Sequence, residues 1–320
     1  MKCTICNSKT IKEKIITRAK KKQNIFICNK CDFEFFPHNP YEKLRKNKLD
    51  VSRLMKAGIK IESIANQFEH GQIQSRNYIK QYLNNNDKKK RVLDIGCSYG
   101  YFLYEIKKFG CKPYGVELNQ KQQYFIKKKL KIRCEENIEK YQKENLTFDK
   151  VFLFYSLEYI PNPVNYISNL IQILSVGGEV VIITPNKNDI LKRVIDNQNY
   201  KNFFYDENSI NYFSIKSLKK IMKLLKIRKY KIKTNQGYSL INLFNWHVNG
   251  KPMKSNFVGE DNFFEDFIKK IKIFKDKKSK NNTKKIKNEM SKFFITCEKN
   301  YEKILEKNRI GNQIILKIKK

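Results

Sequence analysis

The sequence has few acidic residues, few histidines and no long apolar run. It contains 31 Asp and Glu against 67 Lys and Arg, a formal net charge of +36, and three His. No apolar stretch approaches the ~20 residues of a membrane-spanning helix, and the longest strong one, Val151 to Leu157, has the length of a strand. No apolar segment follows Met1-Lys2-Cys3, so no signal peptide is expected. These absences predict a cytoplasmic protein without a transmembrane segment.

The excess of positive charge is typical of proteins that bind nucleic acids or anionic membranes. Here the lysines are spread along the whole chain, and the chain is rich in Lys, Asn and Ile while Arg is scarce. A biased nucleotide composition would produce that pattern, and no single nucleic-acid-binding module gathers the charge. Nucleic-acid binding therefore stays open as an alternative and is not favoured.

One stretch, Arg91 to Asn119, has the order of a nucleotide-binding unit. It reads RVLDIGCSYGYFLYEIKKFGCKPYGVELN. Its first residues predict a buried parallel strand, and apolar residues at helical spacing then predict a helix that Gly110 ends. A second strand, Pro113 to Val116, delivers Glu117 at its carboxyl end. Strand, glycine turn, helix, strand and acid follow one another as in a βαβ nucleotide-binding unit.

The glycine turn indicates which kind of ligand this unit can bind. Gly96 and Gly100 lack Cβ atoms where the backbone must turn sharply or pass close to a ligand. Glu117 lies 21 residues beyond Gly96, well placed to accept hydrogen bonds from ribose hydroxyls. The turn reads G-C-S-Y-G, so the dinucleotide fingerprint G-x-G-x-x-G fails, and the P-loop pattern is also absent. A pyrophosphate cradle is therefore not expected.

These motifs resemble those of class I S-adenosylmethionine-dependent methyltransferases. D-I-G-C-S-Y-G is similar to motif I of that family, and Y-G-V-E is similar to motif II. The resemblance implies an α/β fold with a Rossmann-like seven-stranded sheet. It also implies that Asp94, Gly96 and Gly100 border the methionine and sugar of S-adenosylmethionine, and that Glu117 binds the ribose. A glycine turn in some other α/β fold is the competing interpretation.

Two C-x-x-C pairs lie within residues 1–36: Cys3 with Cys6, and Cys28 with Cys31. Two such knuckles place four thiolates for tetrahedral Zn²⁺, and a closed four-sulfur site is structural rather than catalytic. Disulfides are the alternative, and the expected lack of a secretory signal counts against them. We therefore predict an N-terminal zinc ribbon, stabilised by its metal because a lobe this small cannot build its own core.

Residues 37–90 predict a helical connector, with one helix beginning at Tyr41 and another around Ile61 to Leu83. In methyltransferases that this chain resembles, such a segment covers the cofactor cleft. The resemblance continues at Asn137, which follows a short strand where the family places a polar side chain near the adenine. Asn137 could equally cap the next helix.

A central buried strand, Val151 to Phe154, ends at Tyr155. Because α/β sheets bind ligands at their carboxyl edge, Tyr155 is a candidate cofactor contact. The next residues resemble a family signature of leucine, glutamate and histidine, but Tyr159 replaces the histidine. A phenol with an unperturbed pKa near ~10 is a poor base without help. Tyr159 is thus a candidate catalytic residue, unless positioning alone suffices or the base lies elsewhere.

A second signature follows at Tyr212-Phe213-Ser214. It resembles the Tyr-Phe-Ser that comes after a Glu-His pair in zinc-ribbon methyltransferases of small molecules and glycans, where the segment lies over the acceptor pocket. The histidine is again missing here. Tyr212 is a candidate catalytic residue and Asn211 a candidate acceptor contact; packing and helix capping explain both residues equally well.

The final third predicts the end of the sheet and an insertion. Residues 229–234 and 312–319 alternate as strands, and the resemblance implies that they pair antiparallel. Residues 238–311 lie between them and contain two amphipathic helical patterns, at Phe264 to Phe274 and at Met290 to Ile304. A helical hairpin packed on the domain is the simplest interpretation. Homodimerisation, or attachment to an anionic membrane, is the functional alternative.

The predicted organisation is a zinc ribbon at 1–36, a connector at 37–90, a methyltransferase core at 91–237, an insertion at 238–311 and a last strand at 312–320. The predicted function is S-adenosylmethionine-dependent methyl transfer to a small-molecule or glycan acceptor. Two alternatives remain: an RNA-modifying methyltransferase that uses the basic surface, and a relative that binds the cofactor without catalysis.

Overall fold

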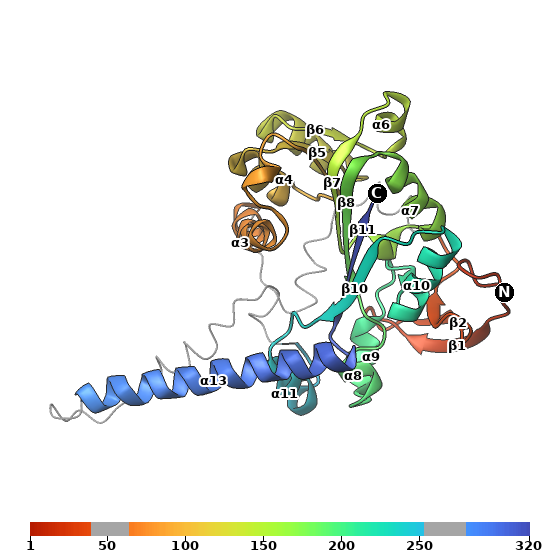
Figure 1. Ribbon diagram of the computed structural model, residues 1–320. Helices are drawn as coiled ribbons and strands as arrows, with labels where there is room; N and C mark the ends of the chain where they lie inside the picture. The colour runs from red at the N-terminus through yellow and green to blue at the C-terminus, as the bar shows by residue number, and fades with distance from the viewer. Residues whose placement is uncertain (40–63, 253–279) are drawn as a thin grey trace.

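Two β-sheets organise the computed structural model, which describes residues 1–39, 64–252 and 280–320. A seven-stranded sheet has the order β10-β11-β8-β7-β4-β5-β6, and a four-stranded sheet has the order β1-β2-β3-β9 (Figure 1). The strands of the large sheet are β4 (Arg91–Ile95), β5 (Lys112–Val116), β6 (Arg133–Glu135), β7 (Phe148–Phe154), β8 (Leu174–Pro185), β10 (Tyr230–Asn235) and β11 (Gln313–Lys319).

Five strands of the large sheet run parallel, from β6 through β5, β4 and β7 to β8. The last two run antiparallel: β11 pairs with β8, and β10 pairs with β11 from Tyr230 opposite Ile318 to Asn235 opposite Gln313. The predicted α/β seven-stranded sheet is thereby confirmed, together with the antiparallel pairing of the two terminal strands. The parallel carboxyl ends all lie at one edge, where the glycine turn follows β4.

Helices cover both faces of this sheet. The described helices and helical turns are α3 (Ile64–Tyr82), η1 (Asn85–Asp87), α4 (Tyr101–Phe109), α5 (Gln120–Phe125), η2 (Ile126–Leu130), α6 (Glu139–Lys143), η3 (Leu157–Tyr159), α7 (Pro163–Gln172), α8 (Ile190–Arg193), α9 (Gln198–Phe204), α10 (Ile215–Leu224), α11 (Leu240–Asn249) and α13 (Lys280–Asn308). Successive residues of the strands contribute to two apolar clusters, one on each face of the sheet. Val92 and Phe152 pack with α3 and α4 on one face, and Leu93 and Val151 pack with α6, α7 and α10 on the other. Such alternation is the period-2 pattern of a sheet buried on both sides.

One boundary differs from the sequence-based expectation. The apolar spacing from Val164 to Leu174 predicts one helix, the pair Gly177-Gly178 predicts its end, and residues 179–184 predict a buried strand. In the structure α7 ends at Gln172, and β8 already begins at Leu174. Leu174 pairs with Phe148 of β7, and the register then shifts before Lys150. The two glycines thus lie within a bulged strand, and Gly177 has a φ of +75°.

The small sheet joins the N-terminal segment to the rest of the chain. Its strands are β1 (Ile11–Ile16), β2 (Lys22–Cys28), β3 (Phe33–Phe35) and β9 (Asn211–Tyr212). The fourth strand comes from far along the chain, and Glu34 pairs with Tyr212 while Phe35 pairs with Asn211. Three of the four cysteines and the β3 phenylalanines share one apolar cluster with the large sheet and α10, and Cys6 packs against that cluster. Residues 1–36 are therefore packed into the core rather than forming a separate lobe.

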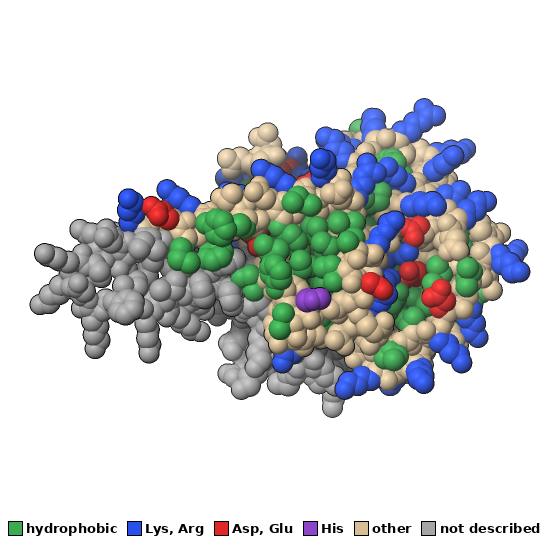
Figure 2. Space-filling view, turned by 90° about the horizontal axis from the view of Figure 1, so that it is seen from below, with side chains coloured by type: hydrophobic (Ala, Val, Ile, Leu, Met, Phe, Trp, Pro, Cys, Tyr) green, Lys and Arg blue, Asp and Glu red, His purple; other side chains and the backbone are tan. Residues whose placement is uncertain are grey.

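The C-terminal region carries exposed apolar side chains. Helix α13 extends beyond the sheet, with α11 beside it (Figure 1). The face of the molecule seen from below shows a broad area of apolar side chains (Figure 2). Exposed large apolar residues of these helices include Phe244, Val248, Phe293, Ile295 and Ile304. The helix predicted at Phe264 to Phe274, like the one beginning at Tyr41, lies outside the described residues. Dimerisation or membrane attachment through this region stays a prediction.

In the described residues, no helix combines the length and the apolar character that crossing a bilayer would need.

Candidate functional site

The turn after β4 is shaped by glycine conformations that other residues avoid. Gly96 has a φ of +74° and Gly100 a φ of +77°, immediately before α4. A Cβ atom on Gly96 would lie 2.2 Å from Ser156 Oγ, at the end of β7, and that hydroxyl donates a hydrogen bond to the Ile95 carbonyl at 2.8 Å. Because Gly96 has no side chain, Ser156 can pack directly against the glycine turn.

Asp94 and Glu117 end the two strands on either side of this turn. Asp94 is 5% exposed, and burial followed by the nearby Glu117 charge raises its pKa to about 8. In the described part of the chain, no cation and no hydrogen-bond donor meets its carboxylate. Burying an acid without a partner is costly, so this position suits a positively charged ligand group.

Glu117 is held by backbone amides. Its Oε2 accepts from the Ser98 amide and its Oε1 from the Asn119 amide, each at 2.9 Å. Burial raises its pKa, and the amide hydrogen bonds oppose that shift. A carboxylate has about four lone-pair positions, so each oxygen retains capacity to accept another hydrogen bond. The geometry suits the binding of two neighbouring hydroxyls.

The two other candidate cofactor contacts lie in different surroundings. Asn137 is exposed after β6, and the N-cap of α6 is Ile138, with no side-chain cap bond, so Asn137 does not cap that helix. Tyr155 follows β7 in a left-handed conformation with φ +52°, and its amide donates to the Ile183 carbonyl at 2.8 Å. Burial, and the phenol of Tyr78 on α3, raise its pKa well above the ordinary value. Helix α3 therefore reaches the end of β7.

The two candidate catalytic tyrosines differ in accessibility, because Tyr159 is half-buried and Tyr212 is buried. Tyr159 ends the short turn η3, and its amide donates to the Ser156 carbonyl. Tyr212 is 4% exposed, and its hydroxyl donates to the Asp206 carbonyl at 2.9 Å while accepting from the Asp206 amide at 3.0 Å. That hydroxyl thus closes a backbone turn, and burial raises its pKa well above the ordinary value.

The structure also shows an acid that the sequence analysis did not single out. Glu158 lies in η3, is 3% exposed, and accepts a hydrogen bond from Thr184 Oγ1, near the end of β8, at 3.1 Å. Burial raises its pKa to about 8. A carboxyl group that titrates near neutral pH can act as a general base. The signal available in the sequence was the glutamate next to the missing histidine.

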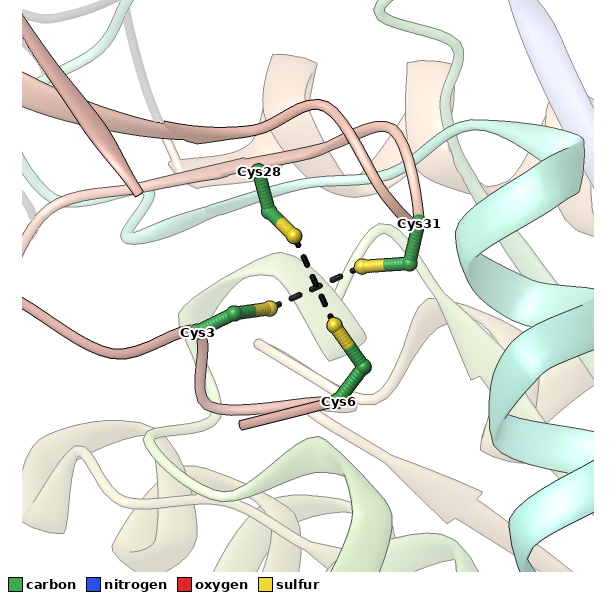
Figure 3. Close-up of side chains that lie close together, drawn as sticks. All are labelled: Cys3, Cys6, Cys28 and Cys31. Carbon is green, nitrogen blue, oxygen red and sulfur yellow. Dashed lines mark hydrogen bonds between the residues drawn. The ribbon is translucent and has the colours of Figure 1, made fainter. Parts of the chain in front are cut away.

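The four N-terminal cysteines converge on one point (Figure 3). Their sulfur atoms all lie within 4.8 Å of one another, with Cys3 to Cys31 at 3.6 Å and Cys6 to Cys28 at 3.4 Å. Tetrahedral Zn–S bonds of ~2.3 Å require sulfur separations of about 3.8 Å. Backbone amides also hydrogen-bond to these sulfurs, including those of Ile5 and Cys6 to Cys3. None of the four forms a disulfide. The donor set and its spacing fit a zinc ion.

A buried ionic network joins the ribbon to the large sheet. Glu34 of β3 accepts from Lys187 Nζ at 3.1 Å, from Lys192 Nζ at 2.9 Å and from the Tyr205 hydroxyl at 2.8 Å. Lys187 also contacts Asp32 Oδ1 at 2.6 Å. The two lysines hold the pKa of Glu34 below its usual range despite its burial. This network fixes the segment after β8 against the ribbon.

Comparison with known proteins shows the family of this chain. A family model described as a methyltransferase domain matches residues 60–225, just over half of the chain. The chain belongs to this family. The expected relationship to class I S-adenosylmethionine-dependent methyltransferases is thereby confirmed.

Two curated relatives cover shorter segments. A sterol 4-C-methyltransferase from Caenorhabditis elegans is 31% identical over 98 residues, which is 28% of this chain and 29% of the relative. A ubiquinone biosynthesis O-methyltransferase from Dechloromonas aromatica is 32% identical over 109 residues, which is 31% of this chain and 46% of the relative. The match therefore spans less than half of the length of either relative.

Solved structures of methyltransferases align with this chain at low identity. A SAM-dependent methyltransferase from Archaeoglobus fulgidus is 20% identical and aligns with a TM-score of 0.47, over 79% of this chain and 96% of that one. The plantazolicin methyltransferase BamL, in complex with a substrate analog and SAH, is 14% identical with a TM-score of 0.46, over 88% of this chain and 95% of that one.

Proposed function

We propose that this protein transfers a methyl group from S-adenosylmethionine to a small-molecule acceptor, with a glycan as the more specific class. The observation that carries the proposal is the pair Asp94 and Glu117, which end adjacent parallel strands beside a glycine turn. Family membership supports the cofactor. The relatives named for a sterol and for ubiquinone biosynthesis support a small molecule as the acceptor.

Different residues at the carboxyl edge of the large sheet are proposed to bind different parts of the cofactor. The unpartnered carboxylate of Asp94 would face positive charge on the methionine portion, and Glu117 would accept hydrogen bonds from the ribose hydroxyls. Gly96 and Gly100 leave room for the backbone turn, and Asn137 and Tyr155 are the proposed contacts nearer the adenine and the acceptor. When bound, S-adenosylmethionine supplies an electrophilic methyl group. Most of the acceleration would come from orientation and from electrostatics.

Glu158 is the proposed proton acceptor for an acceptor hydroxyl or amine. With a pKa of about 8 its carboxylate is a stronger base than that of an ordinary glutamate, and because most molecules carry the protonated form at neutral pH, methyl transfer is expected to accelerate as the pH rises toward 8. Thr184 fixes one of its oxygens. Tyr212 then has a positioning role, because a buried phenol with a raised pKa stays protonated at neutral pH and cannot accept a proton. Tyr159, which ends the turn that carries Glu158, is proposed to position the acceptor.

The cysteine cluster is proposed to hold a structural Zn²⁺. With four protein ligands the coordination sphere would be closed, so the ion would stabilise the ribbon and take no part in methyl transfer. Removing the metal is expected to destabilise the fold, since the cysteine cluster is continuous with the main core.

The test is calorimetric titration of S-adenosylhomocysteine into the full-length protein and into two variants. Glu117→Ala removes the ribose acceptor, whereas Glu139→Ala removes an exposed acid on α6 and serves as the control of equal charge change. We expect saturable binding to the wild type and to Glu139→Ala, and at least about tenfold weaker binding to Glu117→Ala. Absence of binding to the folded, metal-loaded wild type would refute the proposal.

The acceptor class is tested by labelled methyl transfer. The protein and S-[methyl-³H]adenosylmethionine are incubated with separate small-molecule, glycan and RNA fractions of a cell extract. Incorporation into the small-molecule or glycan fraction is expected. Incorporation into RNA alone, with binding that weakens steeply as salt rises, would favour the RNA-modifying alternative. A cytoplasmic location stays a prediction.

A further inference from the structure

A pocket lies where the ribbon, α10 and the turn between α13 and β11 meet. Its volume is about 790 Å³, and it is lined by Asn29, Asp32, Asn186, Asn188, Arg193, Ile215, Lys216, Lys219, Asn308 and Arg309. None of these residues belongs to the proposed cofactor site. A volume of this size accommodates a small organic molecule.

The charge of the pocket is strongly one-sided. Four of its lining residues are cationic, namely Arg193, Lys216, Lys219 and Arg309, and in the described part of the chain none of them forms an ion pair. The single lining acid, Asp32, is already engaged by Lys187 Nζ at 2.6 Å and by Asn188 Nδ2 at 2.6 Å. The pocket therefore offers four positive charges that no nearby acid neutralises.

The walls of the pocket are held in place by buried hydrogen bonds. Asn186 is 1% exposed, and its Nδ2 donates to the Gly311 carbonyl at 2.8 Å while its Oδ1 accepts from the Asn188 amide at 3.1 Å. Ser214 caps α10, and its Oγ also donates to the Asp32 carbonyl at 2.7 Å. Because Asn188 Nδ2 also donates to Asp32, four chain segments are tied together, and the cationic side chains extend from a fixed frame.

We propose that this pocket binds the phosphate or pyrophosphate group of a small molecule. Guanidinium groups match phosphate oxygens with paired N–H donors, and lysine ammonium groups add point charges. The first turn of α10 contributes Ile215 and Lys216 to the lining and adds the partial positive charge of a helix N-terminus. The lining asparagines supply amide donors and acceptors for the uncharged part of the ligand.

The high overall charge is the competing explanation, because any groove on a protein with 36 excess positive charges attracts anions. The two explanations differ in where the charge matters. Diffuse attraction depends on total charge and is screened by salt, whereas a built pocket depends on particular residues and retains affinity at about 0.15 M salt. This proposal does not rest on methyl transfer, and its test needs no cofactor.

The experiment compares two double variants of equal charge by isothermal titration. Arg193→Ala with Lys219→Ala removes two pocket cations. Lys223→Ala with Arg228→Ala removes one exposed cation from the same helix, α10, and one just beyond it, neither of which lines the pocket. The probes are inorganic pyrophosphate and glucose 1-phosphate, at about 0.15 M salt, and a short single-stranded RNA is titrated under the same conditions as the competing ligand. Circular dichroism and thermal unfolding check that both variants are folded.

We expect saturable binding of at least one probe to the wild type. Affinity should fall at least about tenfold in the pocket variant and stay within about twofold in the control variant. Tighter binding of pyrophosphate would point to a diphosphate, and tighter binding of glucose 1-phosphate to a phosphorylated sugar. An equal loss in both variants would overturn the proposal in favour of diffuse charge. Undetectable binding of both probes, or binding only of a short single-stranded RNA, would also overturn it.

Discussion

The raised pKa of Asp94 predicts that cofactor binding depends on pH. Burial and the neighbouring Glu117 charge raise this pKa to about 8 in the ligand-free protein, so at neutral pH most molecules carry a neutral Asp94. A ligand that presents positive charge there binds the ionised form, and Asp94 must lose its proton as the complex forms. Affinity is therefore expected to increase with pH up to about 8 and to level off above it.

The magnitude follows from the fraction of ionised Asp94. With a pKa of about 8, roughly 1% is ionised at pH 6 and roughly 10% at pH 7, so the apparent Kd weakens by about tenfold for each pH unit below 8. Each factor of ten corresponds to about 1.4 kcal/mol. S-adenosylhomocysteine carries a positive α-ammonium group, and S-adenosylmethionine carries a sulfonium charge in addition. Because a single titrating carboxyl group gives at most a tenfold change per pH unit, both ligands are expected to show the same slope below pH 8.

The assay is calorimetric titration of S-adenosylhomocysteine between pH 6 and pH 9, in buffers of different ionisation enthalpy that report the number of protons released. Wild-type protein should release close to one proton at pH 7. Asp94→Asn should bind with little pH dependence and release none. The same variant should unfold at a higher temperature than wild type at pH 9, since it no longer buries an unpartnered carboxylate. A flat affinity for wild type, without proton release, would refute this assignment of Asp94.

Three further predictions concern stability. Glu34→Ala leaves two buried lysines without their shared carboxylate and should lower the free energy of unfolding in denaturant by about 3 to 5 kcal/mol. The control Glu13→Ala, on exposed β1, should lower it by less than about 1 kcal/mol, and similar losses in both variants would contradict the role of the network. Gly96→Ala should cost about 1 to 3 kcal/mol and abolish S-adenosylhomocysteine binding, because the new Cβ meets Ser156 and the φ is positive. In thermal unfolding, a zinc chelator should lower the Tm of wild type but leave that of Cys28→Ser unchanged, and a chelator-insensitive wild type would exclude structural zinc.

Local patterns were sufficient for the parts of the fold that depend on neighbouring residues. The run from Arg91 to Asn119 predicted its strand, glycine turn, helix and second strand because each depends on short-range periodicity and on glycine conformation. The spacing of the cysteine pairs similarly predicted that four sulfurs would meet. The predicted boundary at Leu174 was wrong because the start of β8 depends on its pairing with β7, which contains a bulge. The double glycine alone does not determine that start.

Other features depend on contacts between residues distant in sequence, which one sequence cannot reveal. The hydrogen bond between Glu158 and Thr184 joins the ends of two strands. Glu34 is an ordinary acid of an alternating strand in the sequence, and only the folded chain shows that two lysines more than 150 residues away neutralise it. Tyr212 matched a family signature, yet the turn at Asp206 occupies its hydroxyl. For these residues the motif predicted the location, and the tertiary contacts decide what the side chain can do.

The position of the ribbon indicates what the proposed structural zinc ion would do for the site. Strand β3 follows Cys31 directly, and it pairs with β9, whose Asn211 donates to the Ile160 carbonyl at the end of η3 at 2.6 Å. Glu158 lies in that same turn, and the Ile210 amide donates to its carbonyl at 2.9 Å. A short path of backbone pairing therefore runs from the cysteine cluster to the proposed proton acceptor. A metal ion that orders the ribbon would also order the turn η3 and Glu158 within it, since neither β3 nor β9 is long enough to hold its position alone.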